Sequence, residues 1–497
     1  MLIAKNPVLP GFHPDPSICR AGSEFYLVNS SFEYSPGVPV FRSSDLRRWA
    51  PVGHVLDRPE QLHIAGCRPS GGIYAPTLRH HRDHFWMITT NVSDPPGQLL
   101  VTAADPAGPW SQPIRVPDAH GIDPDLAWDD TGTCRLSWSG ELPKGRQGIL
   151  QAALDTETGA LLSEPAVIWR GTGGQFPEGP HLIKRGRFWY LFIAEGGTER
   201  GHAVTVARGP RPDGPFEPCP TNPLLTARGT DWSTQNTGHA DVVQRPDGSW
   251  AMVFLGVRPR GSTPAWHVLG RETFAAELEW EDDWPRLGQP IEGHAAGPVV
   301  EPLTGPVPPH SWVSPSRHLG DVLKYDPDGH WHLGAASHEE VFAGRRQEHF
   351  FICAQAAVEP VSGGAGLELR IDPFHKVTVW SEDGHVQAIA TIGDLRIALG
   401  ETTAAPTPAL ELRTQPAEGA SGTPRQGPDV IVAGISDRSG FRELGRLDGR
   451  YLSTEVAGGF TGRMIGIVSD SDDAVIKSFV YRGSDQNTDW ESLGQSG

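Results

Sequence analysis

One unit recurs five times in the first half of the chain, and it constrains the fold more than any other feature of the sequence. Each copy has an extended segment, a polar turn, and a second apolar segment that begins ten or eleven residues after a lead residue. Glu178-Gly-Pro-His, for example, leads through Lys184-Arg-Gly-Arg to Phe188-Trp-Tyr-Leu-Phe. The copies start 48 to 61 residues apart. Hairpins repeated at this spacing predict a β-propeller with five blades.

The lead residues of the five copies should point at one place, because equivalent positions in propeller blades lie on a ring around the central axis. Three of the five are carboxylic acids, which a random ring would rarely collect. We therefore expect a carboxylate-lined site on the axis. The lead residues are Asp15, Ala75, Asp123, Glu178 and His239.

Asp15 stands in the stiffest context of the three acids. Pro14 and Pro16 bracket it, and each proline fixes its own φ and pushes the preceding residue into an extended conformation. A surface aspartate does not need this stiffness, but a catalytic carboxylate does. Asp123 also precedes a proline. Asp125 should share the strand face of Asp123 but lie deeper in the channel.

Glu178 differs from the two aspartates in reach and surroundings. It has a longer side chain, and it lies between a proline and Gly-Pro among mostly apolar neighbours. Such surroundings favour the protonated form of a carboxyl group, which suits a proton donor at neutral pH. Glu195, on a loop after the next strand, is a weaker candidate for the same role.

Three further side chains are candidates for the walls of a pocket. Phe32 lies in a Ser/Pro/Gly loop, where it either forms a pocket wall or anchors the loop by packing. Tyr74, beside a lead residue, would suit stacking on a sugar ring or a hydroxyl contact. Arg258 ends an apolar strand and could orient a carboxylate or a sugar hydroxyl, the alternative being a surface arginine.

The remainder of the chain predicts a second domain. A chain of 497 residues is longer than a domain with a single hydrophobic core usually is. Residues 288–309 are rich in Pro and Gly, as linkers are, and from residue 311 short alternating strands predict a β-sandwich. We expect a propeller over residues 1–300 and a sandwich over residues 311–497 that helps to close the site. The Ala/Pro/Thr/Gly-rich stretch 402–428 is expected to be a loop.

Charge and cysteine content exclude several classes of protein. A formal charge of −18 argues against nucleic acid or an anionic membrane as partner. The five cysteines are scattered and form no CxxC, so reduced thiols are expected and zinc ligation is not. The N-terminus has no apolar h-region and no stretch is long enough to span a bilayer, so we expect a cytoplasmic protein.

Taken together, these residues resemble glycoside hydrolase family 43, and more narrowly its two-domain β-xylosidase/α-L-arabinofuranosidase branch. The likeness covers nearly the whole chain, and a set of motifs in this order is highly specific. The motifs are Asn6-Pro-Val-Leu-Pro-Gly-Phe-His-Pro-Asp-Pro-Ser, Ser31-Phe-Glu-Tyr, Gly72-Ile-Tyr-Ala-Pro, Ile122-Asp-Pro, Glu178-Gly-Pro-His, Glu195-Gly-Gly-Thr, Gly238-His-Ala-Asp and Gly270-Arg-Glu-Thr.

The resemblance implies an all-β fold, a five-bladed propeller followed by a C-terminal concanavalin-like sandwich, and a role for each matched residue. Asp15 matches the general base, Glu178 the general acid, and Asp123 the residue that modulates the acid's pKa and orients it. Positions that line the sugar pocket match Phe32, Tyr74, His239 and Arg258. Phe460 matches a sandwich loop that closes the pocket, the alternative being a buried residue of the sandwich. Arg463-Met464 and Asp125 depart from the family's pattern.

The function expected from the resemblance is an exo-acting, inverting β-xylosidase that releases xylose from the non-reducing ends of β-1,4-xylo-oligosaccharides. An α-L-arabinofuranosidase, or a bifunctional enzyme, would use the same three acids. A non-catalytic sugar-binding propeller would lack one of the acids, and a scaffold propeller would show no ring of carboxylates.

No cofactor is expected to be required. Calcium near the axis, at His239, stays open because some relatives carry it there, but a single imidazole is a poor calcium ligand. The expected partner is a xylo- or arabinoxylo-oligosaccharide, with neither nucleic acid nor a membrane. The sequence leaves the oligomeric state open, including a homo-oligomer.

Overall fold

The structure is a computed structural model that describes residues 4–94, 96–142, 145–293, 298–334, 339–403, 408–417 and 426–486. It divides into two compact units. The first unit comprises Met1–Leu9, His13–Val257 and Glu272–His294, and the second comprises Pro10–Phe12, Arg258–Arg271 and Ala295–Gly497. In the described residues, no helix is long and apolar enough to cross a membrane.

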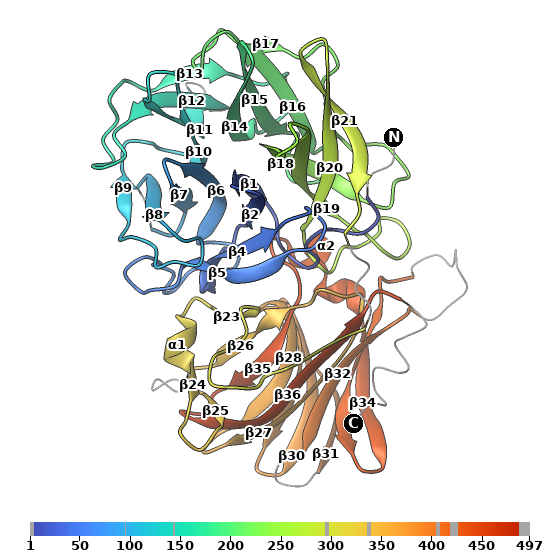
Figure 1. The fold of residues 1–497 in the computed structure, drawn as a ribbon. Helices are drawn as coiled ribbons and strands as arrows, with labels where there is room; N and C mark the ends of the chain where they lie inside the picture. Colours follow the sequence, from blue (N-terminus) through green and yellow to red (C-terminus); the bar gives the residue numbers. More distant parts are fainter. Residues whose placement is uncertain are drawn as a thin grey trace. The chain divides into compact units, whose positions relative to one another are not determined.

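The first unit is a five-bladed propeller, and each blade is a four-stranded antiparallel sheet formed by consecutive strands (Figure 1). A two-residue strand, β3 (Tyr34–Ser35), lies outside the order of blade one. Blade one consists of β1 (Ser17–Ala21), β2 (Glu24–Val28), β4 (Gly37–Ser43) and β5 (Ala50–Leu56), and blade two of β6 (Ile73–His81), β7 (His84–Asn91), β8 (Gln98–Ala103) and β9 (Ile114–Val116). Blade three consists of β10 (Ile122–Trp128), β11 (Cys134–Leu142), β12 (Arg146–Leu154) and β13 (Ala166–Trp169), and blade four of β14 (Glu178–Arg185), β15 (Phe188–Glu195), β16 (Ala203–Gly209) and β17 (Glu217–Pro218). Blade five consists of β18 (Gln235–Gln244), β19 (Trp250–Val257), β20 (Glu272–Glu281) and β21 (Trp284–Ile291).

The first strands of the blades form a closed ring. Strand β1 neighbours β6, β6 neighbours β10, β10 neighbours β14, β14 neighbours β18, and β18 returns to β1. In Figure 1 these strands lie in the middle of the blue-to-yellow unit. The amino-terminal segment supports closure, because Val8 donates its backbone N–H to the Thr273 carbonyl of blade five at 2.8 Å. The five-bladed prediction is confirmed.

The core of the propeller is divided among the junctions between blades. One apolar cluster joins blades one and two, and separate clusters join two to three, three to four, four to five, and five to one. Alternating strand residues produce this pattern, since each sheet packs both of its faces against neighbours. Leu182 and Ala127, for example, share the junction between blades three and four.

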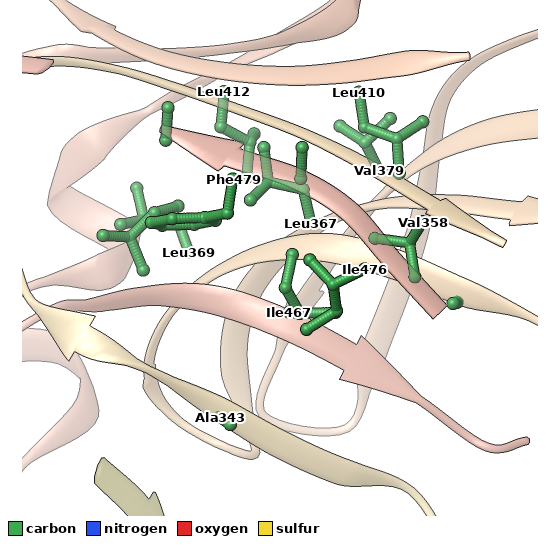
Figure 2. Close-up of a cluster of buried hydrophobic side chains, with 14 of the residues drawn as sticks. Ala343, Val358, Leu367, Leu369, Val379, Leu410, Leu412, Ile467, Ile476 and Phe479 are labelled. Carbon is green, nitrogen blue, oxygen red and sulfur yellow. The ribbon is translucent and has the colours of Figure 1, made fainter. Parts of the chain in front are cut away.

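The second unit is a sandwich of two antiparallel sheets around one apolar core (Figure 2). Leu367 and Leu369 from one sheet and Leu410 and Leu412 from the other all lie in that core. One sheet has the order β24 (Leu323–Tyr325), β25 (Trp331–Leu333), β36 (Ala474–Ser484), β27 (Phe351–Pro360), β32 (Ala409–Gln415), β33 (Val430–Asp437) and β34 (Gly440–Asp448), with β22 (Val299–Pro302) paired to β36. The other runs β23 (Trp312–Pro315), β26 (Val341–Arg346), β35 (Met464–Ser469), β28 (Ala365–Asp372), β29 (His375–Glu382), β30 (His385–Ile392) and β31 (Leu395–Thr403).

Only three short helical segments are present in the described part of the second unit, and the sheets supply nearly all of its order. The segments are α1 (Leu319–Val322), a 3₁₀ turn (Gly449–Leu452) and α2 (Thr454–Ala457).

Two sequence-based expectations about irregular segments were wrong in part. Within the supposed linker 288–309, Val299–Pro302 pairs with β36, and within the supposed loop 402–428, Ala409–Gln415 is strand β32. Leu410 and Leu412 are buried while Glu411 and Arg413 alternate with them, a strand pattern that the Ala/Pro/Thr composition obscured. Residues 404–407 and 418–425 of that stretch lie outside the described residues.

Candidate active site

A left-handed backbone marks the inner end of every blade. Asp15, Ala75, Asp123 and His239 have φ angles of 52°, 32°, 57° and 47°. Residues other than glycine adopt such angles rarely, at a cost of about 1–2 kcal/mol each, and they cluster at functional sites. In blades two to five the strand register shifts at this place, as β-bulges require.

In blade four the left-handed residue is Gly179, with φ 57°, and not Glu178. The expectation that Glu178 is equivalent to Asp15 and Asp123 was therefore wrong by one residue. The register supports this, because His181 pairs with Phe192 as Asp125 pairs with Ser137 in blade three. The number of residues between the lead residue and the second strand of a blade does not reveal the position of the β-bulge in the first strand.

Glycine is required at position 179 for a second reason. An ideal Cβ on Gly179 would lie 2.8 Å from Nε2 of His239. The backbone of blade four thus approaches the imidazole of blade five more closely than any side chain would allow. Glu178 directly precedes this contact, at the first residue of β14, and is half-buried.

Asp15 is held by groups from three blades. Its Oδ2 accepts a 2.6 Å hydrogen bond from the Ser30 hydroxyl, and that hydroxyl accepts the backbone N–H of Ala75 at 2.7 Å. Nδ1 of His239 lies 3.4 Å from Oδ1 of Asp15. The side chain is only 7% exposed, so these contacts fix its direction. Ser30 therefore connects the lead positions of blades one and two.

Hydrogen bonds from two other segments hold the loop that carries Asp15. The side-chain amide of Asn29 donates to the carbonyls of His13 and Pro14, both at 2.9 Å. Thr273 of blade five donates its hydroxyl to the His13 carbonyl at 2.6 Å. The extended conformation expected for Asp15 before Pro16 was wrong, because its φ is 52°, and hydrogen bonds from β20 and from the residue that follows β2 hold the loop instead.

Asp123 controls the backbone around Glu178. Its Oδ2 accepts the N–H of Gly179 at 3.0 Å, and Asp123 is 6% exposed. On the other side, the hydroxyl of Ser139 donates to the carbonyl of Pro177 at 2.9 Å. Blade three therefore holds the chain both before and after Glu178.

Phe32 and Tyr74 lie next to this group. Their rings meet edge to face with centroids 5.5 Å apart, and Tyr74 precedes the lead residue Ala75. Phe32 is 1% exposed and pairs its backbone with Ile73, so it anchors the loop. The Tyr74 hydroxyl donates to the Ser70 carbonyl at 2.6 Å. Sugar contacts of these two rings stay predictions.

Arg258 and Phe460 belong to the second unit. Arg258 directly follows β19, donates to Oδ2 of Asp485 at 2.5 Å, and lies over the ring of Phe350. The guanidinium carbon of Arg271 lies 5.3 Å from the ring centroid of Phe460. Their predicted roles in the sugar pocket also stay predictions.

Glu195, the weaker acid candidate, is a structural anchor. It is 2% exposed, and its carboxylate accepts the backbone N–H groups of Thr172 and Gly174 and the hydroxyl of Thr205. These bonds hold the loop before β14 to the end of β15. A carboxylate so fully engaged is not available for proton transfer to a substrate.

Sequence reasoning missed Ser30, Asn29 and Ser139. Each makes its key hydrogen bond to a residue that is distant in the sequence or belongs to another blade, and serine and asparagine after a strand carry no distinctive pattern. Among the described residues, no group of three or more His, Cys, Asp or Glu side chains is placed to hold a metal ion. None of the five cysteines, all of which are described, forms a disulfide bond.

Comparison with known proteins gives a consistent result. The family model described as "Glycosyl hydrolases family 43" matches residues 4–285. A Butyrivibrio fibrisolvens protein named "Xylosidase/arabinosidase" is 48% identical over 57% of this chain, and the chain spans 56% of that relative's length. A Bacteroides ovatus protein named "Non-reducing end alpha-L-arabinofuranosidase BoGH43B" is 36% identical over 93% of this chain and 90% of its own.

Solved structures extend the similarity over both units. The xylan beta-1,4-xylosidase from Bacillus halodurans C-125 superposes with a TM-score of 0.86 and 30% identity, over 97% of this chain and 100% of that one. The Bacteroides ovatus structure described as "Xyloglucan PUL GH43B" gives 0.84 and 33%, over 97% and 99%.

Proposed function

The chain belongs to glycosyl hydrolases family 43, and on this premise we propose that it is an exo-acting, inverting β-xylosidase that releases xylose from the non-reducing ends of β-1,4-xylo-oligosaccharides. The observation that supports the proposal is a series of contacts through His239 and Gly179 that connects Asp15 to Asp123 and to the backbone next to Glu178. Asp15 meets His239, and Asp123 binds the backbone next to Glu178.

In the proposed mechanism Asp15 is the general base. It takes a proton from a water molecule that attacks the anomeric carbon, and the hydroxyl of Ser30 keeps its carboxylate in one orientation. Glu178 gives a proton to the leaving glycosidic oxygen on the opposite face of the sugar. Inversion needs room for the water, so the two carboxyl groups must stand roughly 6.5–9.5 Å apart. Blade five lies between blades one and four in the ring, which agrees with such a separation.

Asp123 acts through Glu178. Its hydrogen bond to the Gly179 N–H fixes the peptide that follows the acid, and a second negative charge nearby favours the protonated form of Glu178 in the resting enzyme. The proposal assigns Asp123 to orientation and charge, and not to proton transfer.

An α-L-arabinofuranosidase is the second candidate, and one observation favours it. The curated relative that aligns with nine-tenths of this chain carries that name, whereas the relative named for both activities aligns with 57%. The same three acids would serve both reactions, because the two pentoses present similar atoms to the pocket. An enzyme with both activities follows from the same argument.

No cofactor enters this mechanism, and enzymes of this family need none for catalysis. The remaining proposal concerns calcium near His239. Nitrogen donors suit calcium poorly, and the His239 ring already contacts Asp15 and packs against Gly179. We propose that a metal ion is not required.

The function is tested by initial rates on 4-nitrophenyl β-D-xylopyranoside and 4-nitrophenyl α-L-arabinofuranoside, with and without EDTA. A dominant xyloside rate supports the first candidate, and a dominant arabinoside rate supports the second. Proton NMR of the first product should show α-xylose, as inversion requires. No rate on either compound contradicts the proposed substrates, and a loss in EDTA that calcium restores contradicts the metal-free proposal.

The acids are tested by Asp15→Ala and Glu178→Ala, which should each lose at least about 10³-fold in kcat while staying folded. Only Glu178→Ala should recover on a 2,4-dinitrophenyl xyloside, because that leaving group needs no protonation. Asp130→Ala is the control, since Asp130 lies exposed in a turn of blade three and pairs with Lys184. Normal turnover in either acid variant would refute the assignment.

A further inference from the structure

A second layer of polar side chains lies one step deeper in the channel than the three acids. This layer is formed mainly by residues two positions after the left-handed one in each blade. Ser17, Asp125 and Asp241 at these positions are completely buried, and His181 is 3% exposed. Arg79 of β6 joins them, with a side chain that is 14% exposed.

Arg79 contacts all four of the other blades. Nη1 donates to Oδ2 of Asp241 in blade five at 2.7 Å and lies 3.4 Å from the Ile18 carbonyl of blade one. Nη2 donates to Oδ1 of Asp125 in blade three at 2.5 Å and to Nδ1 of His181 in blade four at 2.9 Å. The planar guanidinium of Arg79 thus connects blade two to the four other blades, although each of the five blades is a separate hydrogen-bonded sheet.

The two aspartates that bind Arg79 also join neighbouring blades. Asp241 accepts the Ile18 N–H at 3.0 Å and the Ser17 hydroxyl at 2.8 Å, which connects blade five to blade one. Asp125 accepts the Leu182 N–H at 2.8 Å, which connects blade three to blade four. These are the blades that carry Asp15, Asp123 and Glu178.

The charges in this layer depend on one another. Burial would raise the pKa of Asp241, but the charge and hydrogen bond of Arg79 and the hydrogen bond from the Ile18 N–H lower that pKa to about 2. Burial would lower the pKa of Arg79, and Asp125 and Asp241 instead raise it. Removing the cation would leave two buried carboxylates without compensation, which is strongly unfavourable.

Arg79 also determines the tautomer of His181. A guanidinium only donates, so Nδ1 of His181 must accept, and in the neutral ring Nε2 then carries the proton. The His181 and His239 ring centroids lie 6.2 Å apart, so His181 connects Arg79 to the layer that holds Asp15.

We propose that Arg79 is a positioning residue that fixes the relative placement of the three acids. The proposal rests on the proposed function and deepens it. Asp15, Asp123 and Gly179 each stand two residues before a residue of this layer, namely Ser17, Asp125 and His181, so a displacement of these residues moves the acids. Without the guanidinium, blades one, three and four can move relative to one another, and the base and acid leave the distance that inversion needs.

A purely structural role for Arg79 makes a different prediction. It would lower the melting temperature and leave kcat of the folded enzyme unchanged. A positioning role lowers kcat in folded protein while KM changes little, because the sugar still binds but the carboxyl groups are misplaced. A misplacement of about 1 Å costs roughly 10²-fold in rate.

The experiment compares Arg79→Met and Arg79→Lys with wild type and with Arg208→Met. Arg208, on β16, lies over Trp284 and donates to carbonyl groups in the turn of Asp282 and Asp283, so its loss tests removal of a packed arginine away from the first strands. Arg79→Met should lose about 10²-fold in kcat with KM within about threefold. Arg79→Lys should recover part of the loss, since an ammonium keeps the charge but not the fork. Arg208→Met should keep its kcat.

Wild-type kcat in folded Arg79→Met overturns the proposal. If Arg79→Met does not fold, the kcat of Arg79→Lys is the deciding measurement, and a wild-type kcat in Arg79→Lys also overturns the proposal. Crystal structures of wild type and Arg79→Lys add a readout that needs no substrate. The distance between the Asp15 and Glu178 carboxyl groups should change by about 1 Å, and an unchanged distance counts against positioning. A wild-type enzyme inactive on both glycosides would instead refute the proposed function and leave this structural comparison standing.

Discussion

At the scale of single residues, the site is made by backbone angles as much as by side chains. Asp15, Asp123 and His239 lie at or just before the first strand of their blades, and each has a positive φ that strand residues rarely adopt. Their strain is offset by hydrogen bonds such as Ser30 to Asp15 and Gly179 to Asp123. The geometry therefore depends on contacts that no single residue could supply alone.

Gly179 and Gly186 allow this dependence to be tested. Both lie in blade four, with φ angles of 57° and 60°, but nothing lies within 4 Å of an ideal Cβ on Gly186, whereas Gly179 faces His239. Both alanine variants should lose about 1–2 kcal/mol of stability from backbone strain. Only Gly179→Ala should also lose at least about tenfold in kcat, because its methyl group displaces His239 from Asp15.

Urea unfolding and steady-state rates on both variants check this prediction. Gly186→Ala serves as the control for strain without crowding. Equal kcat in the two variants would contradict the role given to the approach of blade four to His239.

At the scale of elements, each blade is a separate sheet, and the channel side chains join the blades. The apolar clusters between blades supply contact area, while Asp241 and Asp125 supply directional bonds between first strands. Asp241 closes the ring from blade five to blade one without a shared strand, since each blade consists of four consecutive strands.

This closure should weaken in acid. The pKa of Asp241 is about 2 in the folded protein and 3.8 as its ordinary value, so the unfolded chain binds more protons between these values. The stabilisation is complete above about pH 5 and falls as the pH drops toward 2, by about 2 kcal/mol. The free energy of unfolding, measured in urea for wild type and Asp241→Asn, should therefore differ less at pH 2.5 than at pH 5. A difference that does not depend on pH would refute this account.

At the scale of the whole molecule, the two units have separate cores and carry different parts of the expected site. The three acids and Arg79 belong to the propeller, whereas Arg258 and Phe460 belong to the second unit. The expectation that the second unit helps to close the sugar pocket is kept as a proposal.

Phe460→Ala tests that proposal, with Phe374→Ala as the control. Phe374 is an aromatic residue of the same unit that is 54% exposed, and Phe460 packs under Arg271. If Phe460 covers the sugar, its loss removes about 1 kcal/mol of contact and raises KM about fivefold, with kcat nearly unchanged. Phe374→Ala should keep its KM. Equal KM values in wild type and Phe460→Ala would remove Phe460 from the pocket.

The sequence by itself determined the five-bladed propeller and the sandwich pattern, and it singled out the three acids as candidates. These depend on local signals, namely alternation, turn residues and a hairpin repeated at a regular spacing, which the chain carries in short segments. For Asp15 the local signal was right only in part, because the two prolines marked the position but its φ of 52° is not the extended conformation that they predict.

Only the tertiary structure decided the blade-four register, the bonds that orient the acids and the layer around Arg79. Gly179 took the place expected for Glu178 because a one-residue bulge leaves the spacing of hydrophobic residues almost unchanged. In the sequence, Arg79 lies 162 residues from Asp241 and 102 from His181. Strand β22, which comes early in the sequence of the second unit, pairs with β36, which comes late in it. Closing the ring brings such groups together, and no pattern within a short segment encodes which of them will meet.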